Sequence, residues 1–115
     1  MFDKSYIFSL EIIKLYKQLS GEKKEFVLSK QLLRSGTAIG ALIREAQHAQ
    51  SKRDFLNKMS IALKEANETL YWLQLLHDSD FIESPMFYSL RNPSEELVKL
   101  LASIVKTTKN NLREN

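Results

Sequence analysis

The chain has 115 residues, no cysteine, and a net charge of +3 that arises from 17 Lys and Arg against 14 Asp and Glu. This length fits one domain, residues 1–115, which can bury a core without disulfides, and the lack of cysteine excludes a disulfide framework, a thiol nucleophile and a cysteine-ligated metal. No apolar run approaches the ~20 residues of a membrane span, and the N-terminal segment is unlike a secretory signal. We therefore expect a cytoplasmic protein without membrane contact.

Four segments with helical periodicity predict an all-α fold, an antiparallel up-and-down four-helix bundle. The first helix is expected over about residues 2–19, with one side formed by Tyr6, Leu10, Ile13 and Tyr16. The second is expected from about residue 25 to 49, and its core side holds Leu28, Leu32, Ile39, Ile43 and Ala46. Short connections between the segments favour antiparallel neighbours.

The third helix is expected to begin after Ser51, an N-cap candidate with Asp54 three residues later, and to reach about residue 76. Its core face is predicted to hold Phe55, Met59, Ala62, Leu63, Ala66, Leu70 and Leu73. The fourth segment starts at Ser84-Pro85 and ends near residue 111. Within it, Pro93 lacks the N–H for an interior helical bond and predicts either a kink or a fresh helix start.

Two glycines, Gly36 and Gly40, lie one turn apart within the predicted second helix. Glycine costs roughly 1 kcal/mol relative to alanine inside a helix, so a compensating gain is expected. The absence of side chains on two successive turns allows the backbone of a neighbouring helix to come close, as small residues do in other helix pairs. We predict that these glycines serve close helix packing, and we include them in a candidate oligomer interface.

The opposite face of the second helix carries basic residues and no acid: Lys23, Lys30, Arg34, Arg44 and His48, with Thr37 and Ala41 between them. A weaker basic stripe on the fourth helix consists of Lys99, Lys106, Lys109 and Arg113. Ordinary solvated lysines are one interpretation of both stripes. The other is contact with the phosphates of RNA or DNA, which would make binding depend on salt. Such binding would depend mainly on the backbone and shape of the nucleic acid, since no helix-turn-helix, zinc-finger or RNA-binding signature is present.

A second stripe on the third helix lies away from its core face and contains Asp54, Ile61, Glu65, Glu68 and Trp72. It is either a partly covered tryptophan on an ordinary surface or a contact surface between subunits. The carboxylates of this stripe are suited to bind Arg34 or Arg44 of a neighbouring subunit. With the two glycines, the predicted oligomer interface comprises Gly36, Gly40, Ile61, Glu65, Glu68 and Trp72.

Four-helix bundles can hold two metal ions on paired Glu-x-x-His motifs. Glu45 and His48 form one such motif, but the second is missing because Gln74, and not Glu, precedes His77 by three residues. No candidate nucleophile adjoins either histidine in the sequence. We therefore predict no metal, no cofactor, no small-molecule substrate and no enzymatic activity.

Residues 32–76 resemble the bacterial four-helix-bundle family encoded within intervening sequences of large-subunit ribosomal RNA genes. The residues that match the signature of this family are Arg34, Ser35, Ile39, Ile43, Glu45, Phe55, Ser60, Ala62 and Glu65, followed by Glu68 and Trp72. The chain departs from it at Ala38, where Ser is usual, and at Leu42, where Asn is usual. Any hydrogen bonds that those polar groups give in relatives are lost here. The place of Arg34 in the signature also implies an alternative to phosphate contact, a structural pair of Arg34 with Glu65 or Glu68.

The resemblance implies a ring-shaped homo-oligomer, commonly of five subunits, without an established enzymatic activity. It also implies nucleic-acid contact, because similar accessory proteins of diversity-generating retroelements bind nucleic acid through a basic ring surface; this is an analogy of fold. Two hypotheses stay open. One is an oligomeric protein that binds RNA or DNA through its basic stripes, and the other is an oligomeric scaffold or protein-interaction module.

Overall fold

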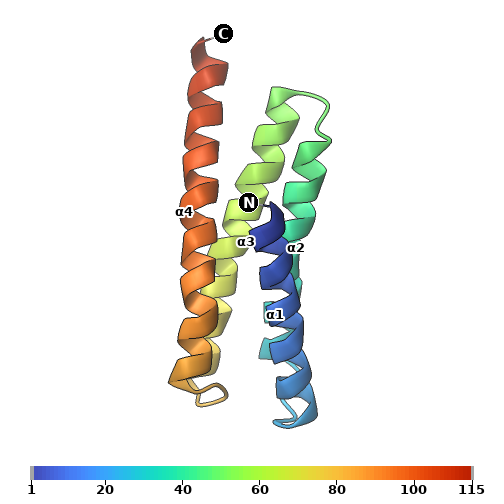
Figure 1. Ribbon diagram of the computed structural model, residues 1–115, viewed down its shortest axis with the longest axis vertical. Helices are drawn as coiled ribbons and strands as arrows, with labels where there is room; N and C mark the ends of the chain where they lie inside the picture. The colour runs from blue at the N-terminus through green and yellow to red at the C-terminus, as the bar shows by residue number, and fades with distance from the viewer. Residues whose placement is uncertain (1, 115) are drawn as a thin grey trace.

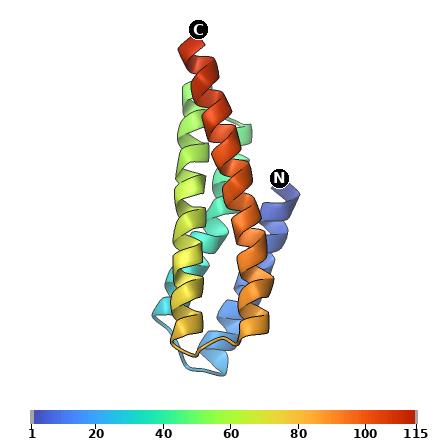
Figure 2. The same ribbon diagram turned by 90° about the vertical axis from the view of Figure 1, so that its left-hand side faces the viewer.

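The computed structural model describes residues 2–114, which form four α-helices and no strand. Their bounds are Phe2–Gly21 for α1, Leu28–Gln47 for α2, Lys52–Asp78 for α3 and Ser84–Glu114 for α4. The helices alternate in direction and lie side by side in a rod of 52 × 21 × 21 Å (Figures 1 and 2). The predicted all-α fold with four helices is confirmed. None of the described helices is long and apolar enough to cross a membrane.

The four helices do not pack with equal closeness. Each helix contacts the next one along the chain extensively, whereas α1 and α4 touch much less. Lys4, near the start of α1, forms an ion pair with Glu96 of α4. The last turns of α4 continue past the start of α1 and lie beside the beginning of α3 (Figures 1 and 2). One end of the rod therefore presents surfaces of α3 and α4 that α1 does not cover.

Helix α2 begins at Leu28, three residues later than predicted, because Glu25 acts as its cap. The carboxylate of Glu25 accepts hydrogen bonds from the backbone N–H groups of Val27, Leu28 and Ser29 at 3.0, 2.8 and 2.7 Å. Burial by itself raises the pKa of this carboxyl, but the N–H groups outweigh burial and hold the pKa below its ordinary value. An acid therefore compensates the free N–H groups at the start of α2.

Ser51 caps α3 as predicted: its hydroxyl oxygen accepts a hydrogen bond from the N–H of Asp54 at 3.0 Å. In α4, by contrast, a fresh start at Pro93 is wrong, because the helix runs unbroken from Ser84. Pro93 has no N–H to donate to the Ser89 carbonyl, and Ser89, Asn92 and Pro93 are all solvent-exposed. The carbonyl of Ser89, which Pro93 cannot serve, is thus on a side of the helix that water can reach.

The buried side of α1 differs from the side marked by Tyr6, Leu10, Ile13 and Tyr16. The buried residues are Ser5, Phe8, Ile12, Leu15 and Leu19, whereas the side chains of Tyr6 and Leu10 are 56% and 47% exposed. Because the apolar residues of α1 extend well beyond one face of the helix, its periodicity alone does not select the core face. The result is an apolar outer face on α1, formed by Tyr6, Ile7 and Leu10, which we call the α1 outer face.

The two glycines of α2 face α1 within the same chain. A Cβ placed on Gly36 would lie 2.9 and 3.0 Å from Cγ1 and Cγ2 of the fully buried Ile12. A Cβ on Gly40 would lie 3.4 Å from the carbonyl and hydroxyl oxygens of Ser5. The close helix approach predicted from the sequence is therefore that of α1, and Gly36 is the tighter of the two positions.

The predicted core positions of the other helices are buried or half-buried. On α2, only Leu28 is less than fully buried; Leu32, Ile39, Ile43 and Ala46 are covered. The buried residues of α3 and the second half of α4 include Met59, Ala62, Ala66, Leu73, Leu97, Leu101 and Val105. One polar contact joins the cores of α2 and α3, where the Thr69 hydroxyl donates to Ser35 Oγ at 3.0 Å.

Candidate nucleic-acid interface

The basic residues of α2 differ in whether they are available to a ligand. Lys30, Arg34, Arg44 and His48 all lie on the exposed face of the helix, as predicted. The guanidinium of Arg44 lies 4.9 Å from the ring centre of Phe2 in α1, a cation–π contact that leaves its N–H groups available. Among these residues, Arg34 is the one committed to other side chains.

Arg34 bridges α2 to two carboxylates of α3. Its Nη1 lies 3.0 Å from Glu65 Oε2, and its Nη2 lies 2.5 Å from Glu68 Oε1. Glu68 also accepts a hydrogen bond from the indole N–H of Trp72 at 3.3 Å. Burial raises the pKa of Glu68, but the bonds from Trp72 and Arg34 outweigh it and lower the pKa below its ordinary value. Arg34 thus pairs within the chain, which the sequence had offered as an alternative to phosphate contact.

The residues of the predicted oligomer interface lie in different surroundings. Gly36 and Gly40 face α1, and Glu65, Glu68 and Trp72 take part in the Arg34 network between α2 and α3. Ile61 is 37% exposed and stands apart from that network. Most of this set therefore already makes contacts inside the chain.

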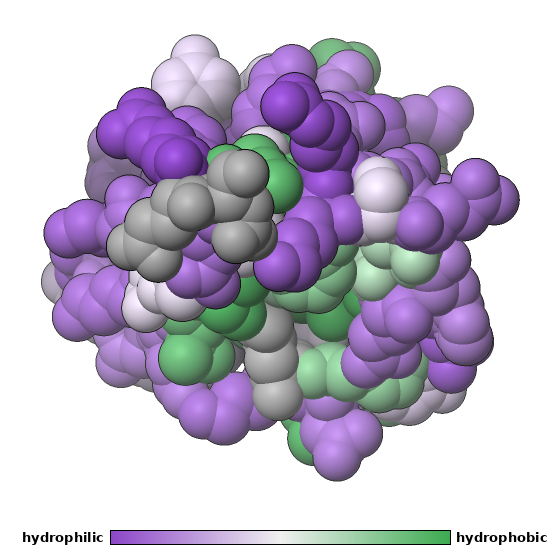
Figure 3. All heavy atoms as spheres, turned by 90° about the horizontal axis from the view of Figure 1, so that it is seen from above, coloured by the Kyte–Doolittle hydropathy of each residue, from purple (hydrophilic) through white to green (hydrophobic). Residues whose placement is uncertain are grey.

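The basic residues of α4, Lys99, Lys106, Lys109 and Arg113, all have exposed side chains. Among the described residues, α2 contacts α1 and α3 but not α4. The two helices occupy diagonal positions in the bundle, so their basic stripes do not line one groove within a single chain. Seen from the end at which the C-terminus lies, hydrophilic residues surround the bundle and apolar residues show between them (Figure 3).

Near that end, α3 and α4 border an open hollow of about 310 Å³, which we call the α3–α4 notch. Its lining residues are Arg53, Leu56, Lys109, Leu112 and Arg113. Arg53 was not among the sequence-predicted residues, nor was its exposed neighbour Lys52. One signal could have found them: they directly follow the N-cap Ser51, and cations are unfavourable in the first turn of a helix.

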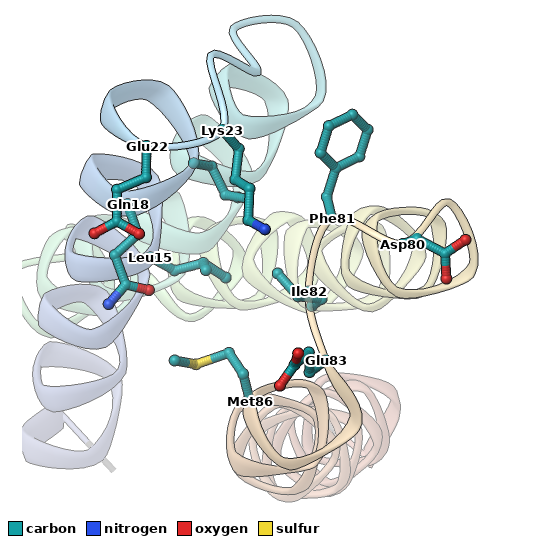
Figure 4. Close-up of a pocket in the computed structure, with 10 residues that line it drawn as sticks. Leu15, Gln18, Glu22, Lys23, Asp80, Phe81, Ile82, Glu83 and Met86 are labelled. Carbon is teal, nitrogen blue, oxygen red and sulfur yellow. The ribbon is translucent and has the colours of Figure 1, made fainter.

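Lys23 lies at the opposite end of the rod, in the connection between α1 and α2. It lines a hollow of about 230 Å³ together with residues of α1 and of the connection between α3 and α4. Figure 4 shows Lys23 and Glu22 on one side of this hollow, and Glu83 and Met86 on the other. The carboxylates near Lys23 oppose the approach of a phosphate. Lys23 is thus separated from Arg44 and from the basic residues near the end of α4.

A possible nucleophile does adjoin a histidine, which corrects the sequence-based statement. His77 Nε2 lies 3.0 Å from Ser84 Oγ, and the histidine ring stacks on Phe87 at 4.3 Å. Asp78 Oδ1 is 3.5 Å from Nδ1, which is buried without a hydrogen-bond partner in the described structure. A catalytic histidine needs a hydrogen bond at Nδ1 to fix its tautomer. We therefore interpret this contact as one that joins α3 to the start of α4.

The residues of the incomplete metal motif do not converge. Glu45 lies 3.6 Å from Lys58 Nζ, and His48 is exposed to solvent. Across residues 2–114, no three His, Cys, Asp or Glu side chains are grouped in a way that could hold a metal ion.

Comparison with known proteins identifies the family of the chain. The family model described as 23S rRNA-intervening sequence protein matches residues 1–103, so the chain belongs to this family. It is also similar to a solved structure of a protein with unknown function from the S23 ribosomal protein family of Bacteroides thetaiotaomicron VPI-5482. The two chains are 58% identical with a TM-score of 0.90, over 91% of this chain and 97% of the other. No curated protein matches the chain.

Proposed function

We propose that this member of the 23S rRNA-intervening sequence protein family binds the phosphate backbone of RNA or DNA and performs no catalytic step. The observation that carries the proposal is the gathering of exposed cations from two helices near one end of the rod. These cations are Lys52 and Arg53 at the start of α3, and Lys106, Lys109 and Arg113 in the last turns of α4. Arg44 on α2 and Lys99 on α4 are further exposed cations, whereas Lys30 lies in the first turn of α2, toward the opposite end of the rod.

In the proposed function the protein contacts the nucleic-acid backbone and does not recognise a base sequence. Exposed lysines and arginines neutralise phosphates and release counterions, which gives affinity without sequence information. Arg34 is left out of the proposed surface because Glu65 and Glu68 occupy its guanidinium. Lys23 is left out because acidic residues share its hollow at the other end of the rod.

The test is an electrophoretic shift with a structured RNA and a duplex DNA at two salt concentrations. We expect binding to both at low salt and a steep loss at high salt. Changing Lys52, Lys106 and Lys109 to Glu should abolish the shift, whereas a control of equal charge, Lys17→Glu with Lys24→Glu and Lys64→Glu, should retain it because these exposed lysines lie outside the cation cluster. A wild-type protein that shifts neither probe at low salt would overturn the proposal.

A second candidate function is that of a homo-oligomeric scaffold, which the α1 outer face favours. Tyr6, Ile7 and Leu10 are 56%, 59% and 47% exposed and adjoin one another on the helix. Exposed apolar side chains that adjoin one another favour contact with a partner, and we propose a second copy of the chain as the covering partner. A ring of five copies is the assembly that the family resemblance favours.

Light scattering tests this candidate. The wild type should be larger than a monomer, and Ile7→Asp with Leu10→Asp should give smaller species whose circular dichroism stays helical, because both side chains lie outside the core. A wild type that is monomeric at high concentration would contradict it. If the protein is oligomeric but binds no nucleic acid, the scaffold function replaces the first proposal.

A further inference from the structure

The α3–α4 notch brings together three cationic side chains from two helices. Arg53 comes from the first turn of α3, whereas Lys109 and Arg113 lie one turn apart near the end of α4. The ion pairs found among the described side chains involve none of these three residues. Like charges around one hollow repel each other, and an anion placed between them removes that repulsion.

The start of α3 adds donors of its own. Of its first N–H groups, that of Asp54 donates to Ser51 Oγ and that of Phe55 donates to the Ser51 carbonyl. The N–H groups of Lys52 and Arg53 have no partner among the described hydrogen bonds. The one acid of this turn, Asp54, accepts the N–H of Gln50 at 3.2 Å. Apart from Asp54, the charged side chains of the first turn of α3, Lys52 and Arg53, are cationic and add to the positive end of the helix dipole.

These cations are not explained by the helix dipoles alone. Arg113 suits the C-terminal end of α4, but Lys52 and Arg53 stand at the end of α3 where cations are disfavoured. Leu56 and Leu112 complete the lining, and the hollow is wide open to solvent. An open hollow with a cationic lining is accessible to an extended polyanion, whose phosphate oxygens can accept charge-assisted hydrogen bonds.

We infer that the α3–α4 notch is a phosphoryl-binding site, and that it holds the nucleic-acid backbone in the function proposed above. That the bound phosphate belongs to a nucleic acid rests on the proposed function. That the notch binds an anion rests on its cationic lining alone. Arg53 would contribute a planar guanidinium for two hydrogen bonds to phosphate oxygens, and Lys109 and Arg113 would add charge from α4. Lys109 and Arg113 lie beyond residue 103, where the family match ends, so the family description does not supply this site.

The experiment compares two variants of equal charge. The notch variant carries Arg53→Gln, Lys109→Gln and Arg113→Gln, and the control carries Lys17→Gln, Lys24→Gln and Lys64→Gln, three exposed lysines that do not line the notch. Fluorescence anisotropy measures the affinity for a structured RNA and a duplex DNA over a range of salt. We expect the notch variant to lose about tenfold or more in affinity at low salt, and its salt slope to fall by up to about 2.7, or 0.9 for each lost contact.

The second measurement uses inorganic tripolyphosphate as a probe, with amide resonances followed by NMR. We expect shifts at Lys52 and Arg53 in the wild type and in the control, and none in the notch variant. Circular dichroism establishes that all three proteins are folded. Because the changed side chains are exposed, the variants should retain the wild-type helix content.

The outcomes separate this inference from the proposed function. Equal nucleic-acid affinity of the notch variant and the control would overturn the notch and leave the proposed function standing. If the wild type binds tripolyphosphate at the notch but no nucleic acid, the proposed function fails and the notch remains a site for free phosphate. If neither probe binds, both are overturned.

Discussion

Replacing each glycine of α2 by alanine gives a matched pair of substitutions that tests the packing of α1 on α2. In both variants the change from Gly to Ala favours the helix by about 1 kcal/mol. The two sites differ in space, because a Cβ on Gly36 would lie 2.9 Å from Ile12 Cγ1, whereas the nearest atoms to one on Gly40 are at 3.4 Å. Only the first distance requires a neighbour to move.

The magnitudes follow from the burial of Ile12, which is 0% exposed. Overpacking of a well-filled core typically costs 1–3 kcal/mol, so Gly36→Ala should range from neutral to about 2 kcal/mol less stable after the helix gain of about 1 kcal/mol. Gly40→Ala meets ordinary contacts and should be up to about 1 kcal/mol more stable. We therefore expect the free energies of unfolding of the two variants to differ by about 1–3 kcal/mol.

Urea unfolding followed by circular dichroism, at one protein concentration, measures this difference as a shift in midpoint at constant slope. A double-mutant cycle sharpens the test, because Ile12→Ala removes the atoms that a Cβ at position 36 would meet. In that background Gly36→Ala should become stabilising. Equal effects of the two alanines in the wild type, or no coupling to Ile12, would refute the argument from close packing.

Three further predictions concern single residues. Glu25→Gln should lower the free energy of unfolding by about 1 kcal/mol at pH 7. Because the pKa of Glu25 is lowered in the folded protein, the whole of this loss should be seen above the ordinary pKa of 4.5. The loss should vanish as the pH falls through the lowered pKa. Thermal melts from pH 3 to 7 measure it, and a loss that is constant with pH would contradict the capping role. Arg34→Met should lower the free energy of unfolding by about 1 kcal/mol, because it leaves Glu65 and Glu68 without Arg34, and the half-exposure of Arg34 keeps this loss small. Its nucleic-acid affinity should stay within about twofold of the wild type. A larger loss of affinity in fluorescence anisotropy would make Arg34 a phosphate contact. Pro93→Ala should raise stability by about 1–3 kcal/mol in thermal unfolding because it restores the bond to the Ser89 carbonyl, and an unchanged melting temperature would contradict this.

The sequence predicted features that depend on residues close together in the chain. Ser51 and Asp54 marked the start of α3, because an N-cap bonds to a residue three positions later. This cap could be predicted without knowledge of the distant chain. The pairing of Arg34 with Glu65 or Glu68, which are 31 and 34 residues away, was an alternative only because of the place of Arg34 in the family signature.

Other features depend on how the helices meet and could not be predicted. Both sides of α1 are apolar, so only its contacts with α2 decide that Ile12 is buried and Leu10 is not. Likewise, Arg53 and Lys109 are far apart in the sequence, and the antiparallel packing of α3 on α4 brings them to one hollow. A helical wheel treats each helix alone, so it could show basic stripes but not the place where cations from two helices gather.

The residues that carry the family resemblance mainly hold the bundle together, and this limits what the resemblance says about function. Arg34 and Glu65 join α2 to α3 through an ion pair, and Ser35 joins them through its bond with Thr69. A side chain that is engaged in this way has little capacity left for a ligand, since the loss of its partner would leave a polar or charged group unpaired. The family match therefore accounts for the fold, while the function must come from side chains that the fold leaves free. Near the end of the rod where α3 begins and α4 ends, those side chains are cationic, and for this reason the proposed ligand is a phosphate backbone.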